Sequence, residues 1–507
     1  MSIEQNLELS NTRPVVGHRF QWLALAAILS LTFLLRVIPL TYSHFWDETV
    51  FLQNAMVMLD ERDNYDELNY RPPVLPLLYA AGFSLWDDIF VAHLVQGGLT
   101  TLAVLFLFLF TRQSFGTAPA FFATLLFAFS PYMVEASHNL LTGVPAITFM
   151  LAAMWLHGRQ GILPALFTGV LFALAVQTRF TSLFLGLYFA SAVVFFHSQL
   201  RRLAWLSLGF AVTLMPYLIW NHLNFGDFLH PFAHARRIVT EFNLPVPASF
   251  YLDAFTEVFP PGVQLFFALG VLSVVVGSVK QWQASASAPA LPLTSRIGDS
   301  WAGQLILLFW AMAFFVYMVS IPHKEVRYLL PLAIPVSILA GLGLSGAIQW
   351  LQRQATVLKF IGFSVVVLVL VLDLGPSLTR LTKPWVDHSQ WEIVQIALFL
   401  LEHSSVDDTI YTAHEFPVLA YYSERKTVSL LPIQDEFEKQ WRDLMSEPGF
   451  LVQFHPEGIG ESHSKHRTFM PDRVFLEATP AFEFVKGYSR ATVYKYRPEP
   501  VGAAARD

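Results

Sequence analysis

Residues 301–348 read WAGQLILLFWAMAFFVYMVSIPHKEVRYLLPLAIPVSILAGLGLSGAI, two long apolar segments joined by the polar sequence HKEVRY (His323 to Tyr328). Each apolar segment has roughly the 20 residues that an α-helix needs to cross the hydrocarbon core of a bilayer. Ionisable groups at a membrane are costly to maintain, so such a cluster is by default a functional-site hypothesis. The stretch therefore predicts two membrane helices and a site between them.

The composition of the whole chain extends this interpretation. Of its 507 residues 54% are hydrophobic, only 14% are charged and 46 are Phe, which is too apolar for an ordinary soluble protein. We predict a mainly α fold, a polytopic transmembrane helical bundle with about 11 spans. The spans are expected near residues 20–40, 89–110, 116–134, 140–156, 162–177, 180–196, 203–220, 261–279, 301–320, 328–348 and 357–375.

The distribution of basic residues predicts the orientation. Short loops facing the cytoplasm carry an excess of Lys and Arg. With the amino terminus inside and the carboxyl terminus outside, the inner loops contain a single acid, Asp299, and many cations. These cations are Arg112, Arg159, Arg201, Arg202, Lys280, Arg296, Arg353 and Lys359. HKEVRY and a second polar sequence, HFWDE (His44 to Glu48), are then both expected on the outer face.

Three regions are expected along the chain. Residues 1–19 form a cytoplasmic segment, 20–378 a transmembrane catalytic domain with a long outer loop at 41–88, and 379–507 a small extracytoplasmic α/β domain. The first apolar segment lacks a small-residue cleavage site and is interpreted as an uncleaved span. The chain has no cysteine, which excludes disulfides and thiolate metal sites. A net charge of −6 gives no reason to expect nucleic acid.

Carboxylates form one half of the predicted site. Asp47 and Glu48 follow the first span, where a carboxylate at the membrane rim suits a general base that deprotonates a hydroxyl. Helix-end charge at the interface is the alternative. Glu135 lies in SPYMVEASHN, after Pro131, which is expected to end or bend the third span. It is either a second site carboxylate or a capping acid of the fourth span.

Cations form the other half. If HKEVRY is helical, His323 and Arg327 share a face, as do Lys324 and Tyr328, while Glu325 pairs with a neighbouring cation. The arginine fork fits phosphate bidentately and lysine adds a point charge. Such cations stabilise the charge that grows on a leaving phosphate. Binding of lipid headgroups is the alternative.

These motifs together resemble a known family. HFWDE after the first span, RPPVLP ending the long outer loop, a Ser-Pro turn followed by an acid, and HKEVRY followed by LLPLAIP are similar to the C-type (GT-C) superfamily of integral membrane glycosyltransferases. The first loop resembles bacterial relatives of the protein O-mannosyltransferases and of the aminoarabinose transferase. HKEVRY is similar to a loop of the lipid-linked and GPI mannosyltransferases. The resemblance covers roughly residues 20–375.

The resemblance implies a function. Such enzymes transfer a sugar from a polyprenyl-phosphate donor to an acceptor hydroxyl on the extracytoplasmic face, usually with inversion. A hexosyl- or pentosyltransferase of the inner (plasma) membrane is expected, with a glycolipid, a polysaccharide or a protein as acceptor. The implied base is Asp47, assisted by Glu48. The implied ligands of the donor phosphate are His323, Lys324, Arg327, Tyr328 and Arg71.

The chain departs from the family pattern at one place. Relatives often carry a second acid near the positions of Thr142 and Gly143, and neither residue is acidic here. Glu135 is therefore the substitute for that acid. Arg179, in QTRFTS, is interpreted either as packing at a tight outer turn or as a basic residue at the outer mouth.

No metal and no cofactor is assigned from the sequence. His455, His463 and His466 cluster in the carboxy-terminal region without the spacing of a zinc site. A divalent cation at the first-loop acids remains open, because only some branches of the family bind one. Two other functions also remain open, a multispan transporter and a non-catalytic scaffold with an outer domain. A transporter would be expected to show repeated halves with interrupted spans, which are not visible here.

Overall fold

The computed structural model describes residues 15–38, 46–61, 71–195, 200–241, 246–247, 249–286, 301–379, 391–430, 437–455 and 473–498. These residues divide into two compact units. The first unit takes its described residues from 15–38, 93–230 and 236–379. The second takes them from 46–92, 231–235 and 391–498.

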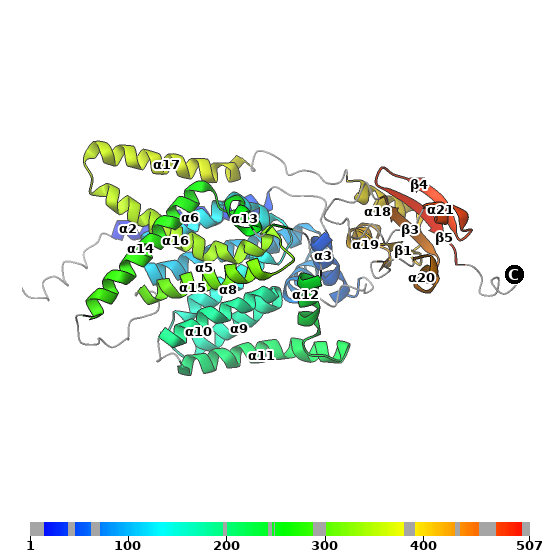
Figure 1. Cartoon of the computed structure of the whole chain (residues 1–507), viewed down its shortest axis with the longest axis horizontal. Coiled ribbons are helices and arrows are strands. Elements are labelled where there is room, and N and C mark those ends of the chain that lie inside the picture. Colours follow the sequence, from blue (N-terminus) through cyan, green and yellow to red (C-terminus); the bar gives the residue numbers. More distant parts are fainter. Residues whose placement is uncertain are drawn as a thin grey trace, which may run out of the picture. The chain divides into compact units, whose positions relative to one another are not determined.

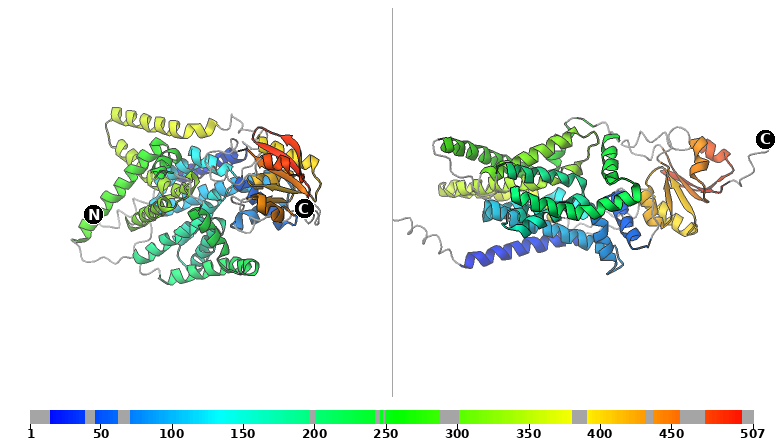
Figure 2. Two further views of the ribbon diagram at one scale, coloured as in Figure 1. Left: turned by 45° about the vertical axis from the view of Figure 1, so that its right-hand side comes forward. Right: turned by 90° about the horizontal axis from the view of Figure 1, so that it is seen from below.

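The first unit is helical, and its long helices run side by side in the views of Figures 1 and 2. Two short 3₁₀ helices, η2 and η4, interrupt the α-helices at places where chain segments meet. The elements are α2 (Val15–Val37), α5 (Phe90–Phe115), α6 (Thr117–Phe129), α7 (Pro131–His138), α8 (Gly143–His157), α9 (Ile162–Thr178), η2 (Phe180–Phe184), α10 (Leu185–Phe195), α11 (Leu200–Phe225), α12 (His230–Glu241), α13 (Phe250–Val258), α14 (Pro261–Ala286), α15 (Trp301–Ser320), η4 (Val326–Leu332), α16 (Ala333–Gln352) and α17 (Thr356–Thr379).

Every apolar segment predicted as a span contains a helix. Seven helices of the described chain are long and apolar enough to cross a membrane, and the bent pair α6 and α7 makes an eighth if it is one span. The segments at 140–156, 162–177 and 180–196 correspond to shorter apolar helices. The prediction of a mainly α, multi-pass membrane fold is confirmed, while the count of 11 spans stays a prediction.

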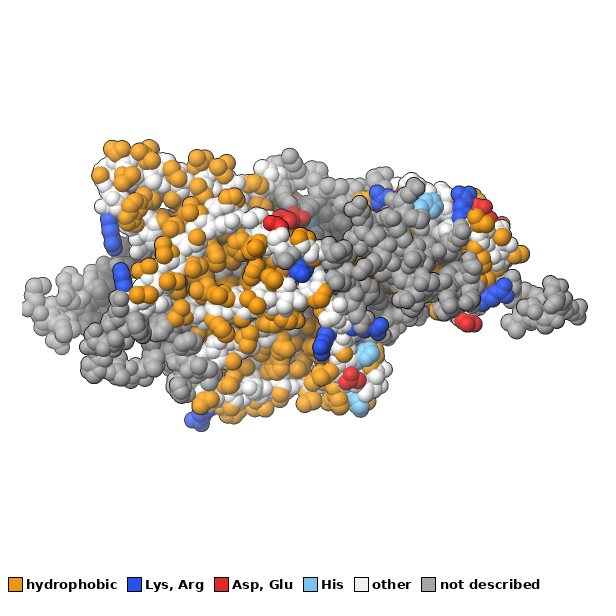
Figure 3. Space-filling model, in the orientation of Figure 1, with side chains coloured by type: hydrophobic (Ala, Val, Ile, Leu, Met, Phe, Trp, Pro, Cys, Tyr) orange, Lys and Arg blue, Asp and Glu red, His pale blue; other side chains and the backbone are white. Residues whose placement is uncertain are grey.

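Apolar side chains cover the outside of these helices. Figure 3 shows hydrophobic atoms over most of the visible helical surface, with charged atoms gathered near helix ends. On α17, for example, Val357 and Phe360 are 72% and 74% exposed. Such a surface is unfavourable in water and suits contact with lipid, which matches the prediction from composition.

Glycines let pairs of helices approach closely. A Cβ atom on Gly343 of α16 would lie 2.0 Å from a carbonyl oxygen of α14, and one on Gly270 of α14 would lie 1.9 Å from a carbonyl oxygen of α16. Gly169 of α9 and Gly209 of α11 make the same reciprocal approach at 2.0 and 2.1 Å. Small residues serve this purpose in membrane bundles, where van der Waals packing stabilises helix pairs.

Pro131 breaks the third predicted span, as the sequence indicated. The axes of α6 and α7 differ by 57°, and carbonyl groups at the end of α6 lose their helical donors because proline has no N–H. The buried guanidinium of Arg36 donates to the carbonyl oxygen of Ala128 (2.7 Å), and the hydroxyl of Ser377 donates to that of Phe129 (2.8 Å). The bend is thus stabilised by two other helices, α2 and α17.

The second unit combines two helices of the long outer loop with the carboxy-terminal α/β domain. The domain has a five-stranded sheet in the order β2-β1-β3-β5-β4, with β2, β1 and β3 parallel and β3, β5 and β4 antiparallel. Its elements are α3 (Trp46–Met58), α4 (Val74–Phe83), α18 (Glu392–His403), β1 (Thr409–Thr412), α19 (Phe416–Ser423), β2 (Thr427–Ser429), α20 (Phe437–Leu444), β3 (Gly449–Phe454), α21 (Arg473–Ala478), β4 (Phe482–Gly487) and β5 (Ala491–Tyr496).

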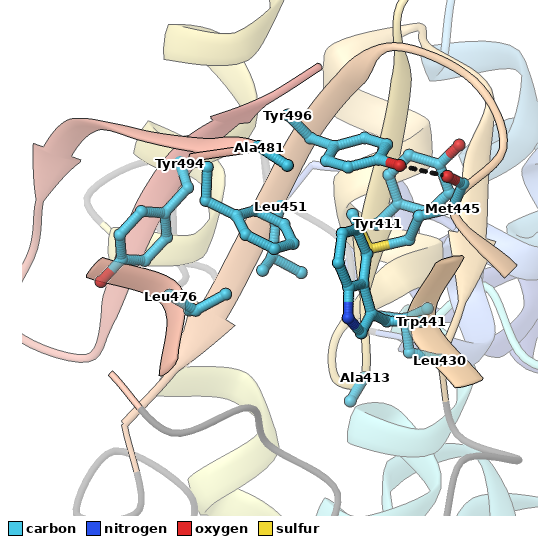
Figure 4. Close-up of a cluster of buried hydrophobic side chains, with 11 residues drawn as sticks. Tyr411, Ala413, Leu430, Trp441, Met445, Leu451, Leu476, Ala481, Tyr494 and Tyr496 are labelled. Carbon is cyan, nitrogen blue, oxygen red and sulfur yellow. Dashed lines mark hydrogen bonds between the residues drawn. The ribbon is translucent and has the colours of Figure 1, made fainter. Parts of the chain in front are cut away.

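The predicted small α/β domain is confirmed. Its central strand, β3, was not predicted from the sequence. One face of the sheet carries an aromatic core in which Trp441 packs on Tyr496 with ring centroids 5.7 Å apart. The Tyr496 hydroxyl donates to the carbonyl oxygen of Met445 at 2.6 Å (Figure 4). A buried tyrosine needs such a partner, so this bond fixes α20 on the sheet.

Helix α3, which carries Asp47 and Glu48, packs against α19 of the same unit. The rings of Trp46 and Phe416 meet edge to face with centroids 4.8 Å apart, and Val50 and Phe416 are fully buried. The side-chain amide of Gln53 donates to the carbonyl oxygen of Pro417 at 2.9 Å. The carboxy-terminal domain therefore holds the helix of the acid pair.

Helix α19 begins at an unusual residue. Glu415 has a left-handed backbone, with φ of 52°, which is uncommon for a residue with a Cβ atom. Burial raises the pKa of its carboxyl group to about 6. This position combines a strained backbone with a poorly solvated carboxyl group, directly before Phe416.

The close approach of α14 and α16 predicts that alanine substitutions at two glycines of α16 have different effects on stability. Gly343→Ala is expected to lower the stability of the purified protein by about 1–3 kcal/mol, because the new Cβ meets backbone atoms and the helices must separate. Gly346→Ala is the matched control, since no atom lies within 4 Å of its Cβ position. Thermal melting in detergent measures both, and equal melting temperatures would contradict the packing.

The carboxyl group of Glu415 predicts a pH dependence of stability. A raised pKa favours the protonated form in the folded state, so its contribution is present below pH 4.5 and is lost as the pH rises through about 6. The loss amounts to about 2 kcal/mol at most. Glu415→Gln is expected to gain melting temperature over the wild type between pH 5 and pH 8.

Glu424→Gln is the control for this experiment, because Glu424 has the same left-handed backbone, with φ of 56°, and is exposed. It should follow the wild type at every pH. Parallel melting curves of wild type and Glu415→Gln across this pH range would show that the carboxyl group is not destabilised by burial.

Candidate functional site

The ends of several elements of the first unit meet at the sequence HKEVRY. Element η4 packs against α8, α13, α15 and α16, and α13 also packs against α7. Residues 323–328, called the HKEVRY cluster below, therefore lie where five helices and a 3₁₀ helix approach one another. The predicted site is built from these segment ends, where backbone and side-chain polar groups are available.

The cluster is not α-helical, so the expected pairing of His323 with Arg327 and of Lys324 with Tyr328 along helical faces is wrong. Pro322 precedes the cluster, and Glu325 has an extended backbone with φ of −137° and ψ of 144°. The 3₁₀ helix η4 begins only at Val326. The extended backbone brings His323 and Arg327 to the same carboxylate instead.

Glu325 is the centre of the cluster. Its carboxylate is 2.8 Å from His323 Nε2 and accepts hydrogen bonds from the Arg327 guanidinium and, at 3.2 Å, from the Tyr328 hydroxyl. The predicted pairing of Glu325 with a neighbouring cation is confirmed. Lys324 forms no ion pair with any described residue. The cluster therefore has one neutralised and one additional positive charge.

Tyrosines from two other helices border the cluster. The hydroxyl of Tyr251 on α13 accepts a hydrogen bond from the backbone N–H of Glu325 at 3.4 Å. Burial raises the pKa of Tyr251 to about 12, so this hydroxyl stays protonated. Tyr132 lies on α7, directly after Pro131, and its side chain interacts electrostatically with Arg327. Neither tyrosine was singled out from the sequence, although Tyr132 follows the proline break.

Arg179 also belongs to this neighbourhood. It follows α9, and its guanidinium lies over the Tyr328 ring, 5.5 Å from the centroid. Its Nε donates to the Thr181 hydroxyl at 3.3 Å. A Cβ atom on Gly143, at the start of α8, would lie 3.4 Å from one of its terminal nitrogens. The structure thus places Arg179 beside the HKEVRY cluster.

Glu135 approaches the same place from α7. Its side chain is exposed, and its charge acts on Tyr132, as do the charges of Arg179 and Arg327. Glu135 and the cations of the cluster therefore surround one tyrosine. Its assignment as a site carboxylate stays a prediction.

The acid pair lies in the second unit. Arg71, just before α4, donates to the Asp47 carboxylate at 2.9 Å, and the Asp47 side chain is 15% exposed. Glu48 is only 3% exposed, and its charge acts on the fully buried Tyr79 of α4. Asp47 is thus the accessible member of the pair, and Arg71 bridges the two ends of the long outer loop.

Among the described residues, no group of three or more His, Cys, Asp or Glu side chains is arranged to hold a metal ion. His455 Nε2 lies 2.8 Å from the Thr492 hydroxyl, so this imidazole nitrogen already has a hydrogen-bond partner within the carboxy-terminal domain. His463 and His466 lie outside the described residues.

The HKEVRY cluster has the chemistry of an oxyanion site. A guanidinium, an imidazole and a phenol converge on two carboxylate oxygens, and the same donors fit two oxygens of a phosphate. The partly exposed guanidinium of Arg327, at 33%, can be reached by such a ligand.

Part of the chain is similar to a known protein family. Residues 70–220 match a family model described as dolichyl-phosphate-mannose-protein mannosyltransferase. No curated protein sequence matches the chain significantly.

Solved structures match nearly the whole chain. ArnT from Cupriavidus metallidurans bound to undecaprenyl phosphate superposes with a TM-score of 0.64 at 16% identity, covering 95% of this chain and 98% of that chain. The oligosaccharyltransferase AglB from Archaeoglobus fulgidus, in complex with an inhibitory peptide and a dolichol-phosphate, gives 0.60 at 11% identity over 96% and 76%. The arabinofuranosyltransferase AftD from mycobacteria gives 0.50 at 13% identity over 94% and 41%. The chain therefore has the C-type glycosyltransferase fold that the sequence motifs indicated.

Proposed function

We propose that this protein is a membrane glycosyltransferase that transfers a sugar from a polyprenyl-phosphate donor to an acceptor hydroxyl. The fold of the C-type glycosyltransferases supports the reaction class. Two relatives of this fold were solved with undecaprenyl phosphate and with dolichol-phosphate, which favours a lipid phosphate as the donor group. The acceptor is proposed to be a hydroxyl of a glycolipid, a polysaccharide or a protein.

The observation that carries this proposal is the bonding of Glu325. Its carboxylate is bound by His323, Arg327 and Tyr328, a donor set that also fits the donor phosphate. We expect the phosphate to replace Glu325 on Arg327, while Lys324, which has no ion pair in the described chain, adds a second cation. Phosphate binding then requires little rearrangement of the protein, because the three hydrogen-bond donors already point to one place.

Asp47 is proposed as the general base. It is more exposed than Glu48 and is held by Arg71, which orients the carboxylate. The acceptor oxygen attacks the anomeric carbon, its proton passes to Asp47, and the bond from carbon to phosphate oxygen breaks. A single displacement of this kind inverts the anomeric configuration. Glu48 and Glu135 are proposed to assist with the acceptor.

The active site is proposed to face the extracytoplasmic side of the inner membrane. Helix α8 runs from Gly143, beside Arg179, to His157, and its 15 residues span roughly 22 Å. Near His157 the Arg202 side chain donates to the backbone carbonyls of His157 and Arg159. Basic residues of the predicted inner loops thus lie at the end of α8 away from the HKEVRY cluster, which agrees with the positive-inside rule.

Two substitutions test the proposal. Asp47→Asn is expected to lower kcat about 10²–10⁴-fold because the general base is lost. Arg327→Ala is expected to lower kcat/KM for the donor about 10²–10³-fold because a phosphate ligand is lost. The assay incubates purified protein with a labelled polyprenyl-phosphate hexose or pentose and crude membrane acceptors.

Two other substitutions serve as matched controls. Asp407→Asn changes an exposed acid of the carboxy-terminal domain, and Arg353→Ala changes an exposed cation at the far end of α16. Both should transfer sugar like the wild type. Transfer that survives unchanged in Asp47→Asn and Arg327→Ala would refute the assigned roles. A wild-type protein that binds the lipid phosphate but consumes no donor would refute the enzyme.

A further inference from the structure

Arg179 is a second guanidinium beside the HKEVRY cluster. Glu325 is bonded to Arg327, and Arg179 lies beside the pair with its guanidinium over the Tyr328 ring. Arg179 forms no ion pair with an acid in the part of the chain that the structure describes. Its only side-chain hydrogen bond there goes to the neutral hydroxyl of Thr181. A half-buried guanidinium is therefore left with a neutral partner.

The strongest charge acting on Arg179 is positive. Burial and then the neighbouring Arg327 lower the pKa of Arg179, and the opposing effect of Glu325 is smaller. Two guanidinium groups held close together repel each other. Such an arrangement is stabilised when an additional anion binds.

Gly143 of α8 lies next to Arg179 and offers it no side-chain partner. It lies at the start of α8, and a side chain there would approach the Arg179 guanidinium, since even a Cβ atom would be 3.4 Å away. An acidic side chain at this position would be placed to pair with Arg179. Because residue 143 is glycine, α8 offers Arg179 no acidic partner at this position.

We propose that Arg179 stabilises the negative charge that develops on the leaving phosphate during sugar transfer. This inference rests on the proposed function and adds a catalytic residue that neither the motifs nor the comparisons assign. The donor phosphodiester carries one negative charge. When the bond from the anomeric carbon to the phosphate oxygen breaks, its electron pair stays on that oxygen, and the acceptor proton goes to Asp47. The product phosphate monoester then carries up to two negative charges.

Arg327 and Arg179 divide this task. Arg327 exchanges Glu325 for the phosphate and binds the single charge already present in the donor. Arg179 forms no ion pair with a described acid, and its positive charge matches the second charge, which appears only as the bond breaks. An interaction that is stronger in the transition state than in the ground state raises kcat without lowering KM.

The test compares kinetics and lipid binding of Arg179 variants. Arg179→Gln is expected to lower kcat about 10²-fold while the donor KM changes little. Arg179→Lys keeps the charge but loses the planar fork, so its kcat should lie between those of wild type and Arg179→Gln. In parallel, Arg179→Gln should weaken binding of undecaprenyl phosphate more than binding of the undecaprenyl-phosphate sugar, because only the former carries the second charge.

Arg159→Gln is the matched control, because Arg159 also lies over an aromatic ring, that of Trp155 at 4.4 Å, but at the far end of α8. It should resemble the wild type in all measurements. Gly143→Asp is a second test of the role of Arg179, and it leaves Arg179 itself unchanged. It should lower kcat by pairing with Arg179, whereas Gly143→Ala should retain more activity at a similar melting temperature.

The outcomes separate this inference from the proposed function. A wild-type protein that transfers no sugar refutes the proposed function and the role of Arg179 with it. If the wild type is active and Arg179→Gln keeps its kcat, or loses only melting temperature or donor affinity, then Arg179 only packs the turn and the inference is wrong.

Discussion

The bonding of one carboxylate, that of Glu325, organises the candidate site in the first unit. Three side chains of different chemistry bind it, and its backbone N–H reaches Tyr251 of another helix. A buried or half-buried charge needs ionic or hydrogen-bond partners, and the surrounding elements end where they supply such partners to Glu325.

The same requirement explains how an apolar bundle tolerates its irregular places. Backbone carbonyls freed at the Pro131 bend are bound by Arg36 and Ser377. At the start of α14 the Asp373 carboxylate accepts the N–H of Val263 at 2.9 Å. In lipid no water can satisfy these groups, so other helices must do so. The irregular segments thereby become fixed, and fixed segments can position Tyr132 and Arg179 for chemistry.

Much of the fold could be predicted from sequence because membrane crossing imposes long apolar runs and because Pro131 is a strong local signal. The conformation of HKEVRY could not be predicted by helical spacing, since Pro322 and contacts with α8, α13 and α15 override local preference. Strand β3 was missed because GFLVQF is a short apolar run, which periodicity alone cannot assign. The neighbours of Arg179 were missed because they come from separate segments.

The sequence also indicated the two groups of predicted site residues unequally. Acids at the start of a helix and cations beside a span are visible in one dimension, so Asp47, Glu48, Lys324 and Arg327 could be named. The bond between Arg71 and Asp47 joins residues on either side of the outer loop and needs the fold. The packing of Phe416 on Trp46 joins the loop to a domain more than three hundred residues later in the chain.

The most direct test of the account is a structure of the protein with undecaprenyl phosphate bound. The account predicts the phosphate oxygens within hydrogen-bond distance of the Arg327 guanidinium, with Glu325 displaced from it. A phosphate found elsewhere, with Arg327 still bound to Glu325, would contradict the claim that the HKEVRY cluster is the donor-phosphate site.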